Sequence, residues 1–272
     1  REKVEIKGFR KGNAPLDLLE KSLDQSKVKE EVLNELLKKY YVEALKENKI
    51  SAIGDPKVDV EGLEKDKDFV FTATVAVKPS VKLKDYKQTL KEKAKEKKQK
   101  AQKDKEEALK SGKPLDQIHD HLHTDEIINA IAEATEVEIS DLLIEDEVNR
   151  YMTRLLNQLQ TLGMEVEDYL KAQRKEPEQL RGEFSQMAEN NLKAEFGMAE
   201  AIIQEKIQVS DEDIENFIKA SGDEKTAEEA KKPEVKWYLR SILEKNRLLE
   251  KIMEELGMGP EETEEKKGDQ NA

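Results

Sequence analysis

The first part of the chain carries two hydrophobic periods in succession. Between residues 28 and 48 apolar side chains recur every three or four positions, which predicts an amphipathic helix with one broad apolar face. Residues 54–56 (GDP) then break the helix, residues 57–60 can begin a strand, and residues 68–77 alternate as a half-buried strand does. A helix packed on an antiparallel sheet defines a small α+β domain.

A Lys-rich stretch follows, in which the apolar pattern nearly disappears. Residues 82–113 hold thirteen lysines against six acidic residues. We expect this stretch to contribute no core. Because Lys alternates with Glu and Gln, the pattern favours a solvated helical connector over an RNA-binding arm.

Helical periodicity returns at His119, and we expect the chain to be helical throughout from there. The clearest apolar stripe runs over residues 144–162. Capping chemistry predicts several boundaries. These are Ser140 and Ser210 as N-caps, Gly163 as a C-cap, Pro177 as the first residue of a long helix with Gly182 and Gly197 as weak points, and Pro233 and Gly257 around the last helix.

Composition narrows the class of protein. Charged residues make up 40% of the 272 positions and there is no cysteine, which excludes disulfides and thiol chemistry and fits a reducing compartment. Residues 1–118 carry a net charge of +6 and the remainder −19, so only the first part suits a nucleic-acid partner. No apolar run is long enough to cross a bilayer, and we expect no membrane partner.

Catalytic chemistry is scarce in this sequence. No phosphate-binding loop, dinucleotide fingerprint or HExxH motif is present. The sequence HDHLH holds all three histidines, and on a helix His119 and His123 would share a face that can bind metal. Two ligands without a third favour solvated helix residues instead. We therefore expect neither enzyme activity nor a metal or other cofactor.

The stretch GFRKGNAP, residues 8–15, combines an aromatic ring and two cations between turn-forming residues. Gly8 and Gly12 permit conformations closed to other residues, and Pro15 can open a helix, which residues 16–22 would form. Such a loop can present Phe9, Arg10 and Lys11 to a partner. An ordinary turn with Phe9 tucked inward is the alternative.

All six methionines fall in the second part of the chain. Methionine adapts to irregular partners, so together they indicate a surface for varied clients, whereas any single one is more often a core residue. Our candidate client contacts are three of the methionines and two aromatic residues of the same part. They are Met152, Met187, Met198, Phe184 and Phe196.

Two segments resemble the bacterial trigger factor family. KGFRKGNAP is similar to the signature loop GFRxGxxP, matched here by Gly8, Phe9, Arg10, Gly12 and Pro15, and FVFTATVAVKPSVKLKDY resembles the remainder of the family's ribosome-binding domain. The segment beginning DEIINAIAEATEVEISDLL is similar to the family's helical substrate-binding domain. The resemblance covers residues 1–86 and 119–256.

The resemblance implies a fold and a function. It implies an α+β ribosome-binding domain at residues 1–86, a linker at 87–118, a helical chaperone domain at 119–258 and a disordered tail at 259–272. Gly8, Phe9, Arg10, Lys11, Gly12 and Pro15 would then dock on protein and RNA of the large ribosomal subunit beside the exit tunnel. The chain would hold unfolded nascent polypeptides in the cytoplasm without ATP, with self-association left open.

The sequence also departs from the family pattern. Trigger factors usually carry an FKBP-type prolyl isomerase domain between the two segments, and the roughly thirty Lys-rich residues here are too few to form one. The family also has a strand and a helix ahead of the loop, where this sequence shows only REKVEIK. Two alternatives stay open: a prolyl isomerase whose catalytic domain lies outside this sequence, and a periplasmic holdase of similar helical build.

Overall fold

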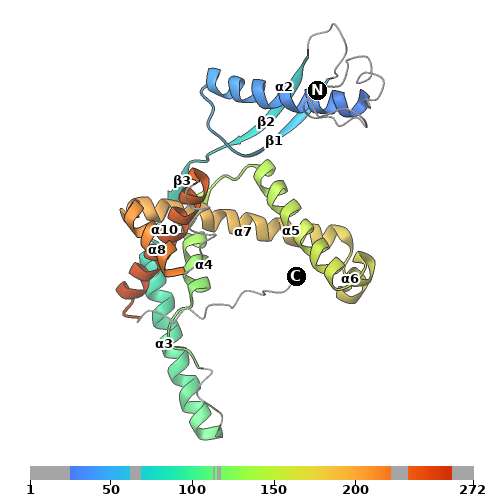
Figure 1. The fold of residues 1–272 in the computed structure, drawn as a ribbon. Helices are drawn as coiled ribbons and strands as arrows, with labels where there is room; N and C mark the ends of the chain where they lie inside the picture. Colours follow the sequence, from blue (N-terminus) through green and yellow to red (C-terminus); the bar gives the residue numbers. More distant parts are fainter. Residues whose placement is uncertain (1–24, 62–68, 113, 115–117, 222–231, 259–272) are drawn as a thin grey trace. The chain divides into compact units, whose positions relative to one another are not determined.

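The structure is a computed structural model that describes residues 25–61, 69–112, 114, 118–221 and 232–258. The chain forms two compact units, Arg1–Lys78 and Pro79–Ala272, and each is described by itself (Figure 1). The predicted helix at residues 16–22 and the predicted disordered tail at 259–272 lie outside the described residues.

The first unit is a helix beside a two-stranded antiparallel sheet. Helix α2 spans Gln25–Glu47, as the apolar period predicts, and β1 (Ala52–Val60) pairs with β2 (Phe71–Val77). Strand β1 begins at Ala52, earlier than the predicted start at residue 57. The turn-forming residues Gly54 and Pro56 lie within the strand, where its pairing with β2 shifts register between Ile53 and Lys57. A bulge accommodates a proline that a regular ladder would reject.

The second unit contains a small sheet that the sequence analysis missed. Strand β3 (Val81–Leu83) pairs antiparallel with β4 (Thr135–Val137), so the expectation of an entirely helical chain from His119 onward is wrong. The reason is length: three residues are too few for a recognisable period of two. The pairing joins segments more than fifty residues apart.

Helix α3 (Tyr86–Ser111) corrects a second expectation. The Lys-rich stretch is helical as predicted, but one of its faces is buried at Tyr86, Leu90, Ala94, Ala101 and Ala108. The first three belong to the main core of the second unit. Spacings of four and seven residues keep these small and apolar side chains on one side of the helix, so α3 contributes to the core despite its charge.

Among its described residues, the second unit has five further helices besides α3 and α4 (Thr124–Ala134). They are α5 (Asp141–Thr161), α6 (Val166–Gln173), α7 (Pro177–Gln204), α8 (Asp211–Ser221) and α10 (Pro233–Glu255). The predicted caps are confirmed at Ser140, whose Oγ accepts from the Leu142 N–H, and at Ser210, whose Oγ accepts from the Asp213 N–H. Gly163 and Gly257 follow their helices with positive φ angles.

The main core joins α3, α4, α7 and α10. Its largest fully buried side chains come from three of these helices and from the segment before α4, namely Leu90, Leu122, Ile127, Ile131 and Leu248. Gly197 lets α7 approach the small sheet closely, since a Cβ at this position would overlap the Thr135 hydroxyl. That hydroxyl donates to the Ile131 carbonyl 2.7 Å away.

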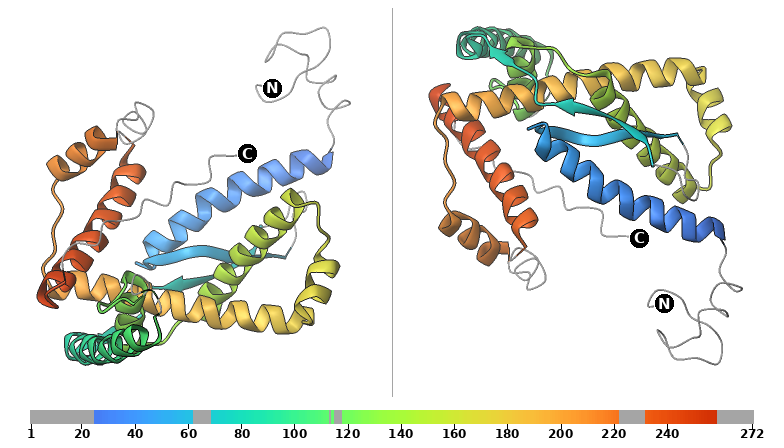
Figure 2. Two further views of the ribbon diagram at one scale, coloured as in Figure 1. Left: turned by 90° about the horizontal axis from the view of Figure 1, so that it is seen from below. Right: turned by 90° about the horizontal axis from the view of Figure 1, so that it is seen from above.

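One end of α7 leaves this core. In Figures 1 and 2, α5 and α6 accompany the first half of α7 away from α4 and α10. We call residues 141–193 the arm. None of the described helices combines the length and the apolar character that crossing a membrane requires.

Candidate functional site

The loop predicted to dock on the ribosome is not part of the described structure. Gly8, Phe9, Arg10, Lys11, Gly12 and Pro15 all lie outside the described residues. Their role therefore stays a prediction from sequence.

The first unit has an open apolar groove of about 920 Å³ between α2 and its sheet. The alternation predicted for residues 68–77 is confirmed at Phe69, Phe71, Ala73 and Val75, which all line the groove. The rings of Phe69 and Phe71 stack with centroids 5.5 Å apart. Val77 lies outside the groove and is exposed. Helix α2 provides the opposite wall with Leu36, Tyr40, Tyr41, Ala44 and Leu45. Helix α2 thus covers the sheet only loosely.

The arm of the second unit leaves large apolar side chains in solvent. Met187 on α7 is 54% exposed, Leu162 at the end of α5 is 66% exposed, and Leu156 and Met164 are also exposed. Two further candidates, Met152 on α5 and Phe184 on α7, are half-buried. The Phe184 ring packs edge to face against the Tyr151 ring, with centroids 5.8 Å apart. The arm therefore exposes scattered large apolar side chains.

The core end of α7 places one candidate in the protein interior. Met198 is only 4% exposed and belongs to the main core, which favours the alternative that a single methionine is a core residue. Phe196 is half-buried. The methionines divide equally: Met198, Met253 and Met258 are buried in the core, whereas Met152, Met164 and Met187 lie on the arm and are not.

Sequence reasoning missed an aromatic pair at the start of α10. Trp237 is 70% exposed, and its neighbour Tyr238 is also exposed. Exposed tryptophan is uncommon because burial of its large apolar surface is favourable. The signal was present in the sequence, since Trp237 is the only tryptophan and lies between Lys236 and Tyr238.

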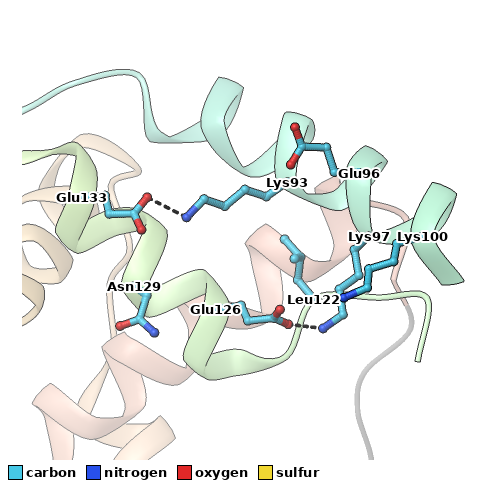
Figure 3. A pocket seen from close by; sticks show the side chains of 8 residues that line it. All are labelled: Lys93, Glu96, Lys97, Lys100, Leu122, Glu126, Asn129 and Glu133. Carbon is cyan, nitrogen blue, oxygen red and sulfur yellow. Dashed lines mark hydrogen bonds and ion pairs between the residues drawn. The ribbon is translucent and has the colours of Figure 1, made fainter. Parts of the chain in front are cut away.

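A polar pocket of about 480 Å³ separates α3 from α4 (Figure 3). Lys93 pairs with Glu133 at 2.6 Å, and Lys97 pairs with Glu126. Burial acts to raise the pKa of Glu126, but hydrogen bonds from the Lys97 ammonium and the His123 backbone N–H outweigh it and lower this pKa. The two lysines and the two glutamates neutralise each other in pairs. The two ion pairs therefore connect α3 to α4.

The histidines do not occupy a helix face, which corrects the helical interpretation of HDHLH. Helix α4 begins only at Thr124, and His123 caps it. The three rings of His119, His121 and His123 pack edge to face, with centroids 5.0–5.7 Å apart. Within the described part of the chain, no group of three or more histidine or acidic side chains is arranged to hold a metal ion.

A partly buried ionic cluster connects α3, the end of α7 and α10. Glu205 follows α7 and accepts from the Tyr86 hydroxyl at 3.0 Å, while it pairs with Lys87 at 2.8 Å and Lys251 at 2.5 Å. Burial opposes ionisation, but the hydrogen bonds from Lys251, Lys87 and Tyr86 dominate and lower the pKa of Glu205 to about 2. Burial, together with the bond to Glu205, raises the pKa of Tyr86.

The chain is thus an α+β protein whose helical unit carries a partly exposed arm. Two family models match it: bacterial trigger factor protein over residues 1–111, and bacterial trigger factor protein C-terminus over residues 111–257. The chain belongs to the bacterial trigger factor family. The two matches meet at residue 111, so no isomerase domain separates them in this sequence.

Individual relatives match over a short segment. The chain is similar to the trigger factors of Streptococcus pneumoniae and Clostridium acetobutylicum, each 40% identical over 84 and 87 residues respectively. That of Corynebacterium jeikeium is 38% identical over 85 residues. These alignments cover 31–32% of this chain and 16–20% of the relatives. No solved structure matches the chain.

Proposed function

We propose that this chain is an ATP-independent, ribosome-associated chaperone of the cytoplasm that holds nascent polypeptides. The observation that carries the proposal is the arm, where Leu156, Leu162, Met164 and Met187 are exposed on a helical scaffold. Membership of the trigger factor family supports the same function. No step of this function requires a bound nucleotide or other cofactor.

Client binding would rest on many weak apolar contacts. Leu162 and Met187 stand on separate helical segments, and Met164 and Met187 have flexible side chains that fit differently shaped partners. Each contact buries little area, so a client can leave and fold without an energy source. Charged residues between the apolar ones keep the free arm from aggregating.

Aggregation of an unfolded client tests this assignment. The double variant Leu162→Ser with Met187→Ser should need a severalfold higher ratio of chaperone to client for the same suppression of light scattering. The matched control, Gln160→Ser with Gln186→Ser, changes exposed polar residues of the same arm and should behave like the parent chain. Equal suppression by both variants would remove client binding from the arm.

Ribosome docking would be the task of the loop at residues 8–15. Arg10 and Lys11 suit phosphate or carboxylate groups, and Phe9 suits an apolar pocket. Replacing Phe9, Arg10 and Lys11 by Ala should strongly reduce co-sedimentation with ribosomes. Lys38→Ala with Lys46→Ala, on the exposed side of α2, is the control and should retain binding.

The isomerase alternative predicts a different result. We expect no acceleration of prolyl cis/trans isomerisation in a short peptide, because the two family matches adjoin at residue 111. Measured acceleration that FKBP-type inhibitors block would overturn this part of the proposal.

A further inference from the structure

The lysines on the two sides of α3 differ in whether they form ion pairs. Three lysines that face the rest of the second unit pair with carboxylates of other segments: Lys93 with Glu133, Lys97 with Glu126, and Lys105 with Asp120. These pairs fix one side of α3 against α4 and the segment before it. They also neutralise the charges of these three lysines.

The outward side keeps its charge. Lys91, Lys95, Lys98, Lys103 and Lys110 are all exposed, and none forms an ion pair with any residue that the structure describes. At about 100° per residue they share one arc of roughly 140°, outside the arc that holds the buried side chains and the paired lysines. Glu92 and Glu106 are the acidic residues within the outward arc. We call these five lysines the lysine stripe.

The dimensions of the stripe suit a polyanion. Lys91 and Lys110 are nineteen residues apart in one continuous helix, which corresponds to about 28 Å at about 1.5 Å per residue. A nucleic-acid duplex presents about one phosphate charge per 1.7 Å of its axis, so several lysines can meet phosphates at once. Gln99 and Gln102 lie between the lysines and can donate hydrogen bonds to phosphate or sugar oxygens.

The choice of residue points to the backbone of a nucleic acid and not to its bases. Lysine offers a flexible point charge, and α3 contains no arginine to read base edges with two parallel bonds. The net charge of the chain is −13, so overall charge would not hold it on RNA. Attraction must come from this local stripe.

The residue pattern of this stretch by itself favours a solvated connector, but the structure separates paired from unpaired lysines. We therefore propose that the lysine stripe of α3 binds the phosphate backbone of structured RNA without sequence preference. The choice of RNA over another polyanion rests on the proposed ribosome association, but the stripe would act separately from the loop at residues 8–15. It would provide a second, salt-sensitive contact that orients the helical unit on an RNA surface.

The test uses the full chain and an end-labelled RNA duplex of mixed sequence, followed by fluorescence anisotropy at several salt concentrations. The variant Lys91→Gln, Lys95→Gln, Lys98→Gln should bind at least about tenfold more weakly at low salt. The plot of log K against log salt should become less steep: the magnitude of its negative slope should decrease by about 2 to 3, one for each lost phosphate contact. Circular dichroism should show unchanged helicity, since all three side chains are exposed.

A matched control removes the same charge elsewhere. Lys171, Lys193 and Lys219 lie on α6, α7 and α8, each paired within its own helix. Their triple Gln variant should bind RNA within twofold of the parent chain. Equal weakening by both variants, or no RNA binding by the parent chain, would overturn the proposal, as would binding to anionic lipid vesicles in place of RNA.

The loop variant separates this proposal from the proposed function. Replacing Phe9, Arg10 and Lys11 should strongly reduce ribosome co-sedimentation while leaving the affinity for the naked duplex within about twofold. If that variant keeps its ribosome binding, the docking assignment fails while the lysine stripe stands. If the loop variant loses ribosome binding but the α3 variant binds the duplex as tightly as the parent chain does, the proposed role of the lysine stripe fails while the docking assignment stands.

Discussion

The two halves of α7 have the same secondary structure but different surroundings. In the arm half Met187 is 54% exposed, whereas in the core half Met198 is 4% exposed and packs with residues of α4 and α10. Both residues are methionines in one uninterrupted helix. The difference shows that residue type and helical position do not decide burial, because only a neighbouring element can cover a side chain.

The largest contrast is expected from the two methionines themselves. Met198→Ala should lower the free energy of unfolding by about 2–5 kcal/mol, because it removes packed atoms and leaves a cavity in the core. Met187→Ala removes an exposed side chain and should change stability by less than about 0.5 kcal/mol. Urea unfolding of both variants measures the difference. Equal destabilisation would contradict the division of α7.

The two helix glycines of α7 should respond in opposite directions. Gly197→Ala forces a methyl group against Thr135 and should destabilise the chain by about 1–3 kcal/mol. At Gly182, in the arm half, an added methyl group would have no heavy atom of another segment within 4 Å. Gly182→Ala should therefore stabilise the chain by about 0.5–1 kcal/mol through helix propensity. Thermal melts of the pair would test how closely α7 approaches the small sheet.

Two ion pairs between α10 and the last part of α7 differ in how far their glutamates are exposed. Glu205 is 13% exposed and pairs with Lys251, while Glu195 is 53% exposed and pairs with Lys245. Glu205→Gln should cost on the order of 1–3 kcal/mol at neutral pH, because it leaves the buried Tyr86 and two partly exposed lysines without a charged acceptor. Glu195→Gln should cost less than about 1 kcal/mol.

The Glu205 cluster also predicts a pH dependence. Its folded pKa is about 2 against an ordinary value of 4.5, so its contribution is complete above pH 4.5 and is lost as pH falls through about 2. The stability difference between the parent chain and Glu205→Gln should shrink over this window. Unfolding curves recorded between pH 7 and pH 2 measure it. A difference that does not change with pH would contradict the assigned shift.

The candidate site could be predicted only in part. The family resemblance located both segments, and the methionine pattern drew attention to the arm residues Met152 and Met187. It also included Met198, because a methionine stripe looks the same whether a core or a partner covers it. Trp237 and Tyr238 were overlooked, since an aromatic pair in an amphipathic helix is usually a core feature.

The sequence by itself determined where several helices begin or end. Ser140, Pro177, Ser210 and Gly163 act on their own backbone or on the next turn, so their effect does not depend on distant segments. The broad period of residues 28–48 likewise set the extent of α2 to within a turn.

Tertiary structure alone decided which faces are covered. The pairing of β3 with β4, the close approach at Gly197 and the burial of one side of the Lys-rich α3 each require two segments that are distant in sequence. The same holds for the separation of paired from unpaired lysines on α3, because their acidic partners lie on other segments. Local patterns specify a helix, but burial and charge pairing are properties of the contact between elements.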